Sequence, residues 1–118
     1  MLARRVCRPN LVTGLSLDQN EMKLVAQRVF TLERAYIMRE GITKDDDALQ
    51  GKWVTEGVKG GPYDGRTIDP EKWNVMLAEY YRARGWDPAS GIPTRKTLKK
   101  LSLDDITAGL QQQGIETP

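Results

Sequence analysis

Two long helical patterns, separated by a stretch that can continue neither, constrain the fold of this chain most. From Leu17 to about Glu40, apolar residues recur at alternating spacings of three and four, which predicts a long amphipathic helix. The stripe consists of Met22, Val25, Val29, Leu32 and Tyr36, and it is widened by Ala26, Phe30 and Ile37. Ser16 and Gln19 have the spacing of a capping box at its start, and Gly41 is placed to end it. We therefore expect this helix to be covered over more than one face.

The second pattern begins at Asp69 and Pro70, an N-cap residue followed by proline at the first helical position. Gly85 is placed to close the helix. An apolar and aromatic stripe lines one face, formed by Trp73, Met76, Leu77, Tyr80 and Tyr81. The simplest interpretation is that the stripe belongs to the core. The alternative is that part of it covers a cofactor or a neighbouring domain.

The stretch from Ile42 to Ile68 is rich in glycine and proline, including Gly60-Gly61-Pro62, and shows no sustained apolar alternation. This predicts a long irregular crossover between the two helices. Irregular stretches above roughly 15 residues are uncommon in compact domains and tend to be functional or held against another part of the protein. Trp53 and Tyr63 are the residues expected to hold it.

Two short helices are expected after the second pattern. Thr94 is placed to cap a helix that carries Leu98 and Leu101. Ser102 is expected to cap the last one, with Leu103, Ile106 and Leu110 at helical spacing and Gly114 at its end. With no convincing strand signal, residues 1–118 are predicted to form one all-α domain, a small irregular helical bundle with a long Gly/Pro-rich crossover between the first two main helices.

Histidine and cysteine usage limits the chemistry. The chain of 118 residues has no histidine, which removes the commonest general base and zinc ligand, so hydrolytic functions are disfavoured and no catalytic residue is assigned. Cys7 is the only cysteine, so no internal disulfide can form. A single cysteine cannot hold an iron–sulfur cluster, which usually needs four ligands. Cys7 is therefore either an ordinary thiol or at most one ligand of a shared site.

The charge balance gives no sign of a nucleic-acid or membrane partner. Lysine and arginine outnumber aspartate and glutamate by only 18 to 16. A helical nucleic-acid binder using the arm of Arg4, Arg5 and Arg8 is the least favoured interpretation, because such proteins usually carry a basic face. No apolar run approaches the roughly 20 residues that span a bilayer. We therefore expect a cytoplasmic protein that binds neither nucleic acid nor membrane.

Charged residues after the first helix permit two interpretations each. The run Asp45-Asp46-Asp47 lacks the glycine and closing glutamate of a calcium loop, and it is interpreted as a solvated turn or the cap of a following helical turn. Glu40 opposes the helix dipole, so it either has a specific partner or forms a surface ion pair with Arg39.

Several motifs in a fixed order resemble the C-terminal domain of the aldehyde ferredoxin oxidoreductase family, over about residues 12–110. They are Arg28-Val29-Phe30-Thr31-Leu32-Glu33-Arg34-Ala35, the loop from Arg39 to Leu49, Gly61-Pro62, Met76-Leu77-Ala78-Glu79-Tyr80-Tyr81, Arg84-Gly85-Trp86-Asp87, and Gly91-Ile92-Pro93-Thr94 leading to Leu98 and Leu101.

The resemblance implies a part of a cytoplasmic tungsten enzyme that oxidises aldehydes to carboxylic acids and passes electrons to ferredoxin. Related members include benzoyl-coenzyme A reductase subunits. The complete enzyme is expected to contain tungstopterin and a [4Fe-4S] cluster, held together with the remaining domains or subunits. Cys7-Arg8 is similar to the family's cysteine followed by a basic residue, which makes Cys7 the candidate single ligand of the shared cluster.

Two hypotheses remain. In the first, the chain is a C-terminal domain or fragment of a tungstopterin iron–sulfur oxidoreductase that acts on the aldehyde or oxo group of donors. It binds no cofactor and has no activity alone. In the second, it is a non-catalytic helical protein-interaction module derived from that domain.

Overall fold

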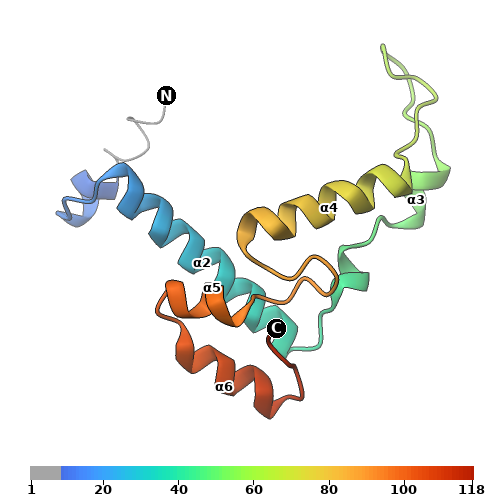
Figure 1. Cartoon of the computed structure of the whole chain (residues 1–118). Helices are drawn as coiled ribbons and strands as arrows, with labels where there is room; N and C mark the ends of the chain where they lie inside the picture. The colour runs from blue at the N-terminus through green and yellow to red at the C-terminus, as the bar shows by residue number, and fades with distance from the viewer. Residues whose placement is uncertain (1–8) are drawn as a thin grey trace.

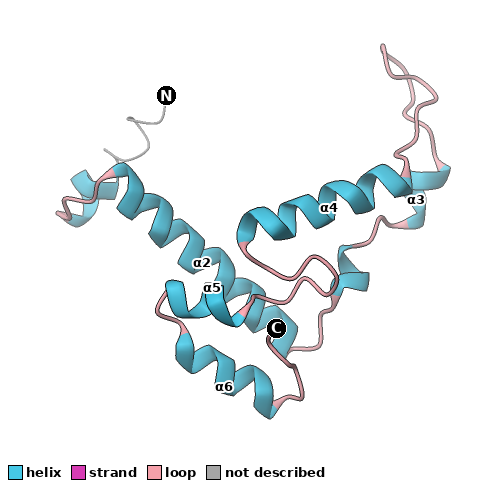
Figure 2. Ribbon diagram, in the orientation of Figure 1, coloured by secondary structure: helices cyan, strands magenta, loops and turns pink. Residues whose placement is uncertain are grey.

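The computed structural model describes residues 9–118, and every regular element in them is helical (Figures 1 and 2). Residues 9–13 are helical. The elements that follow are α2 (Gln19–Arg39), the 3₁₀ helix η1 (Lys44–Asp47), α3 (Gly51–Thr55), α4 (Pro70–Arg84), α5 (Arg95–Lys100) and α6 (Asp104–Gln112). A single bridge between Trp86 and Pro93 is the only strand-like pairing in this range. The all-α prediction is confirmed.

The start of α2 is a capping box, but it lies two residues after the predicted one. The Asp18 carboxylate accepts hydrogen bonds from the backbone N–H groups of Asn20 and Glu21 at 2.7 and 2.8 Å. The Glu21 carboxylate accepts from the backbone N–H of Asp18 at 2.7 Å. The prediction of Ser16 and Gln19 was wrong because two carboxylates satisfy the positive end of a helix better than a hydroxyl and an amide.

The buried face of α2 is not the predicted apolar stripe. The buried residues are Thr31, Arg34, Ala35 and Met38. Val29 and Tyr36 of the stripe remain 50% and 56% exposed. The stripe is exposed because no other element of the described chain covers it, whereas α6 and the loop after α4 pack on the opposite side.

Helix α4 begins and ends where the sequence predicts. The Asp69 side chain accepts from the backbone N–H of Glu71 at 2.9 Å, and Gly85 adopts a left-handed φ of 74° after the last turn. The core assignment of its stripe is correct only in part. Tyr81 is 1% exposed, but Met76 and Tyr80 remain exposed.

The crossover contains more helix than predicted, because it includes η1 and α3. A loop follows α3 and is closed where the backbone N–H of Val58 donates to the Arg66 carbonyl at 2.9 Å. This loop projects away from the helices (Figure 1). Trp53 and Tyr63 are 56% and 59% exposed. Neither ring is buried within the described chain, so their role in holding the crossover against another part of the protein stays a prediction.

The C-terminal helices form the densest part of the core. Leu98, Leu101 and Leu103 are packed together, and Ile106 packs against them. Thr94 caps α5 as predicted, since its hydroxyl accepts from the backbone N–H of Thr97. The prediction for α6 was wrong at one residue, because Leu103 rather than Ser102 is the N-cap and no side chain caps it.

The described chain is extended for its length. Its radius of gyration is 18.0 Å, whereas a compact domain of this size has about 13 to 14 Å. Helices α2 and α4 diverge from their shared end near the loop of residues 85–93 (Figure 1). The buried hydrophobic side chains among residues 9–118 are Ala35, Met38, Tyr81, Trp86, Leu98, Leu101, Leu103 and Leu110, together with Pro93. This is a small core for so long a chain.

Candidate functional site

The predicted metal ligand, Cys7, lies outside the described residues 9–118, as do Arg4, Arg5 and Arg8. Within residues 9–118, no group of three or more His, Cys, Asp or Glu side chains is placed to hold a metal ion. None of the helices in this range combines the length and hydropathy needed to cross a bilayer.

The most organised polar group in the structure is centred on Arg34, in the middle of the buried face of α2. Its side chain is 4% exposed, and its Nη2 lies 2.6 Å from Asp47 Oδ2 at the end of η1. Its Nε donates to the Gly91 carbonyl at 3.1 Å, and Nη2 reaches the Tyr81 hydroxyl at 3.4 Å. The Tyr81 hydroxyl donates to Asp47. We call Arg34, Asp47 and Tyr81 the Arg34 cluster.

Aromatic rings surround the guanidinium. The Arg34 Cζ lies 5.4 Å from the Tyr81 ring centroid and 5.5 Å from that of Trp86, so the cation faces two π systems. Trp86 Nε1 donates to the Thr31 hydroxyl at 3.4 Å, one turn before Arg34 on α2. Trp73 Nε1 donates to the backbone carbonyl of Asp47 at 3.2 Å. The aromatic residues thus fix both the arginine and its carboxylate partner.

The electrostatics of the cluster keep it in one protonation state. Burial alone would raise the pKa of Asp47, but hydrogen bonds from Arg34 and Tyr81 and the charge of Arg34 outweigh burial and lower that pKa. Burial and the hydrogen bond to Asp47 raise the pKa of Tyr81 well above its ordinary value. At neutral pH the cluster holds an ionised aspartate and a protonated tyrosine, so it offers no free general base. Its role is to join η1, α4 and the loop of residues 85–93 to α2.

Sequence analysis did not find this cluster. Asp47 was part of an acidic run interpreted as a turn or a cap, but Thr43 caps η1 through the backbone N–H of Asp45 at 3.3 Å. The cap interpretation was therefore wrong, because the three aspartates lie inside η1 and do not cap a following helical turn. Asp45 and Asp46 are exposed, as a solvated turn predicts, whereas Asp47 is partly buried in its ion pair. Arg34 lay inside a quoted motif without a role. The available signal was its spacing from Thr31 and Met38, which places a charged residue on one face with small and apolar ones.

The other charged pair considered from the sequence is a surface contact. Arg39 Nη2 lies 3.0 Å from Glu40 Oε1, and both side chains are about half exposed, at 46% and 56%. Such a pair contributes under about 1 kcal/mol. Of the two interpretations of Glu40, the surface ion pair is the one observed.

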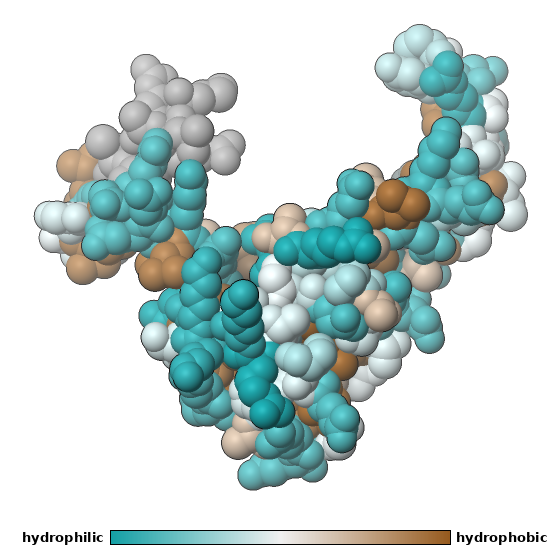
Figure 3. Space-filling model, in the orientation of Figure 1, coloured by the Kyte–Doolittle hydropathy of each residue, from teal (hydrophilic) through white to brown (hydrophobic). Residues whose placement is uncertain are grey.

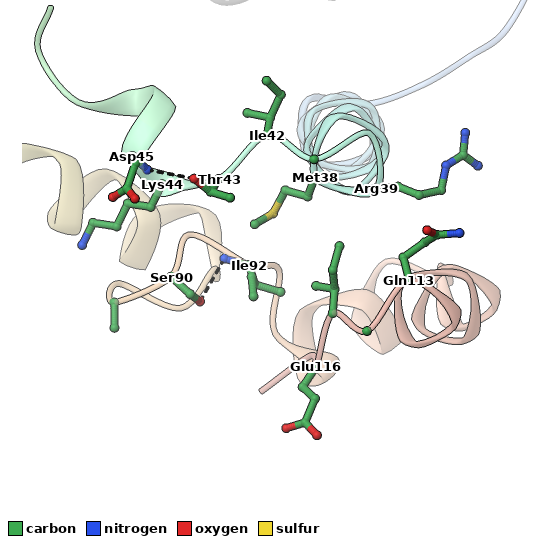
Figure 4. A pocket seen from close by; sticks show the side chains of 14 residues that line it. Met38, Arg39, Ile42, Thr43, Lys44, Asp45, Ser90, Ile92, Gln113 and Glu116 are labelled. Atoms are coloured by element: carbon green, nitrogen blue, oxygen red, sulfur yellow. Dashed lines mark hydrogen bonds between the residues drawn. The ribbon is translucent and has the colours of Figure 1, made fainter.

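A hollow of about 730 Å³ lies between the end of α2, the start of η1, the loop of residues 89–92 and the segment after α6 (Figure 4). Arg39 and Glu116 at its rim point away from it. Its inner polar groups already have partners: Lys44 Nζ donates to the Pro88 carbonyl at 3.2 Å, and the Ser90 hydroxyl accepts from the backbone N–H of Ile92 at 3.3 Å. None of the lining side chains carries a buried polar atom without a hydrogen-bond partner, so nothing there points to a particular ligand.

Exposed apolar surface is the other prominent feature. Apolar patches lie over the outer half of α2 and where α3 meets α4, among hydrophilic side chains (Figure 3). A cleft of about 230 Å³ lies between α2 and α4, with Phe30, Ile37 and Tyr80 in its walls and the Arg34 cluster at its base. Exposed contiguous apolar surface usually marks an interface with another protein or domain. The structure thus combines one fixed polar cluster with helices whose apolar sides are open.

Comparison with known proteins identifies the family to which these helices belong. The family described as "Aldehyde ferredoxin oxidoreductase, domains 2 & 3" matches residues 9–103. The chain belongs to this family. The resemblance seen in the sequence is confirmed.

Relatives and a solved structure agree with the family match. The tungsten-containing aldehyde ferredoxin oxidoreductases of Pyrococcus horikoshii and Pyrococcus furiosus are each 27% identical over 98 residues, which is 82% of this chain but 16% of each relative. The active site complex BamBC of benzoyl coenzyme A reductase, solved with 1,5-dienoyl-CoA, has a TM-score of 0.64 and 28% identity. The match covers 86% of this chain and 14% of that chain. The chain therefore spans about a sixth of the length of these relatives.

Proposed function

We propose that this chain is the C-terminal helical part of a tungstopterin iron–sulfur oxidoreductase that acts on the aldehyde or oxo group of its donor. The observation that carries the proposal is the open apolar side of α2 in a chain that matches about a sixth of its relatives' length. A helix that remains apolar and exposed in the isolated part is what a domain looks like when the surface that covers it belongs to another part of the protein.

In this proposal the metal centre belongs to the complete cytoplasmic enzyme, which passes electrons to ferredoxin. Because residues 9–118 hold no ligand set, the remaining domains would bind tungstopterin and most of the [4Fe-4S] cluster, with Cys7 as at most one cluster ligand. Those groups would supply the electron transfer. The helices of this chain would form a wall that excludes water, kept in shape by the Arg34 cluster.

The test is reconstitution of the enzyme from two polypeptides. This chain is co-expressed with a polypeptide that carries the remaining family domains from the same organism, and aldehyde-dependent reduction of a redox dye is measured. The proposal predicts activity from the pair and none from either polypeptide alone. A pair that assembles with its metal centres but shows no activity with aldehydes or other oxo donors would contradict it.

Metal analysis of the chain alone provides a second test. Purified chain should contain neither tungsten nor stoichiometric iron, because its single cysteine cannot hold a cluster and the pterin-binding domains of the proposed enzyme lie outside it. A full iron–sulfur cluster on the isolated chain, detected by its absorption and its iron content, would refute a shared site.

The second candidate is a non-catalytic interaction module that keeps the family fold, and the same exposed apolar surface favours it. The two functions differ in whether binding of this chain to its partner polypeptide produces enzymatic activity. In the module hypothesis, the chain binds a partner protein but adds no activity to any polypeptide of the family. Reconstituted activity therefore decides between them.

A further inference from the structure

The exposed side of α2 is wider than a single stripe. We define the apolar arc of α2 as Met22, Val25, Ala26, Val29, Phe30, Leu32, Tyr36 and Ile37. At about 100° per residue these positions cover about 160° of the helix circumference. All of them except Met22 are exposed, with Val29 at 50% and Tyr36 at 56%. An arc this wide is typical of a helix with neighbours on both sides.

One charged side chain lies inside the arc. Glu33 is exposed and, by its helical position, lies near the middle of the arc, whereas Arg28 and Lys23 lie beyond its two edges. Glu33 takes part in none of the ion pairs formed within residues 9–118. A surface that covers the arc would remove this carboxylate from water, so it must provide a cation or other donor for it.

The arc is bounded by two hollows that a second helix could fill. One, of about 160 Å³, lies between α2 and α6 and is lined by Leu32, Tyr36 and Ile106 among others. The other is the cleft of about 230 Å³ between α2 and α4, which Glu33 also lines. From Met22 to Ile37 the arc is about 22 Å long. Its length and flanking hollows suit a helix lying along α2 with apolar side chains on either side.

We propose that a helix from the remaining domains of the same family enzyme packs along the apolar arc of α2 and places a lysine or arginine against Glu33. This interface rests on the proposed function, and the share of the relatives' length that lies outside this chain, about five-sixths, leaves room for such a helix. A second copy of the chain is a poorer partner. The two cations beside the arc are already engaged, since Arg39 stacks on Tyr36 and pairs with Glu40, and Arg84 stacks on Phe30. Two arcs packed together would therefore bring no free cation to either Glu33 carboxylate.

The test measures Kd by calorimetry between this chain and the polypeptide that carries the remaining family domains. Glu33→Lys should raise Kd about tenfold or more, because two cations then face each other in a desolvated contact. Glu33→Gln should have a smaller effect. Glu79→Lys is the matched control: it makes the same change on an exposed position of α4, outside the arc, and should leave Kd within about twofold.

The outcomes separate this interface from the proposed function. If the wild-type chain binds and reconstitutes activity while Glu33→Lys binds equally well, the interface is wrong and the proposed function stands. If the wild-type chain does not bind at all, both are wrong. A dimer of the isolated chain that Val29→Asp dissolves would assign the arc to a second copy and overturn the proposal. Circular dichroism checks that each variant is folded. Because Glu33 is exposed, its substitution should leave the helical content unchanged.

Discussion

At the scale of single residues, the structure depends most on one buried charge. The Arg34 guanidinium is 4% exposed and is matched by the Asp47 carboxylate, the Tyr81 hydroxyl and the Gly91 carbonyl. A buried ion pair adds little compared with an apolar pair of the same shape, but removing one partner leaves the other charge unsatisfied. The cluster therefore specifies which segments meet α2, and its loss should be costly.

Arg34→Met tests this directly. The variant should lose about 3 kcal/mol of unfolding free energy, because Asp47 loses its cation and the Gly91 carbonyl loses its donor. Arg39→Met, which removes only the exposed pair with Glu40, should change it by less than about 1 kcal/mol. Urea denaturation followed by tryptophan fluorescence measures both. Equal effects for the two variants would mean that the cluster does not hold the fold.

The lowered pKa of Asp47 predicts how stability changes with pH. Because the folded pKa lies below the unfolded value of about 3.9, this stabilisation is fully present above about pH 4 and is lost as the pH falls through the folded pKa. Asp47→Asn should therefore be less stable than wild type at neutral pH, and the difference should shrink in acid. A hydrogen bond from Ser90 also lowers the pKa of Asp87. The free energy of unfolding should therefore still fall with decreasing pH in both wild type and Asp47→Asn. A stability difference that is constant from neutral pH into acid would contradict the assignment.

At the scale of elements, the sequence predicts where a helix begins and ends better than it predicts which face of the helix is buried. The start of α4 at Pro70 and its end at Gly85 follow from local chemistry, so the sequence was sufficient. Which face of α2 is buried depends on what packs there. The stripe containing Val29 is exposed because no described element covers it, while the buried face includes Thr31 and Arg34, whose polarity argued against burial.

The Arg34 cluster could not be predicted from the sequence for a related reason. Arg34 and Asp47 belong to different elements, and the loop that carries Gly91 is distant from both in the sequence. No local pattern reports a contact between segments so far apart. Cys7, the one residue that chemistry alone singled out, lies outside the described residues, and its role as a cluster ligand stays a prediction.

The loop of residues 85–93 is an element whose close approach to α2 can be tested with glycine substitutions. A Cβ on Gly91 would lie 2.6 Å from Arg34 Nη2 and 2.9 Å from Tyr81 Cζ, and its φ is +71°. A Cβ on Gly61 would meet no atom within 4 Å, although its φ is +78°. Gly61→Ala should therefore cost roughly 1–2 kcal/mol of backbone strain alone.

Gly91→Ala should cost the same strain plus about 1–3 kcal/mol for displacing side chains that the cluster holds in place. Thermal unfolding monitored by circular dichroism compares the two variants. If Gly91→Ala is no less stable than Gly61→Ala, the loop does not pack tightly against the cluster.

At the scale of the whole molecule, the described chain is more open than a compact domain of the same length. Its radius of gyration of 18.0 Å exceeds the about 13 to 14 Å of a compact domain of this length. Its core is concentrated in α5, α6 and the end of α2, while the outer half of α2 and the start of α4 have no buried residue. The proposed function would account for this shape, because the relatives are about six times longer than the matched part and their remaining domains would cover α2.

Hydrogen exchange measured by mass spectrometry tests the central claim that the rest of the family enzyme covers α2. The chain is compared alone and in complex with the polypeptide that carries the remaining family domains. Peptides from residues 22–30, the part of α2 without a buried residue, should exchange readily in the isolated chain and become strongly protected in the complex. Those from residues 98–110 should change little because their core is already closed. Protection of residues 22–30 that is the same in both states would contradict the claim.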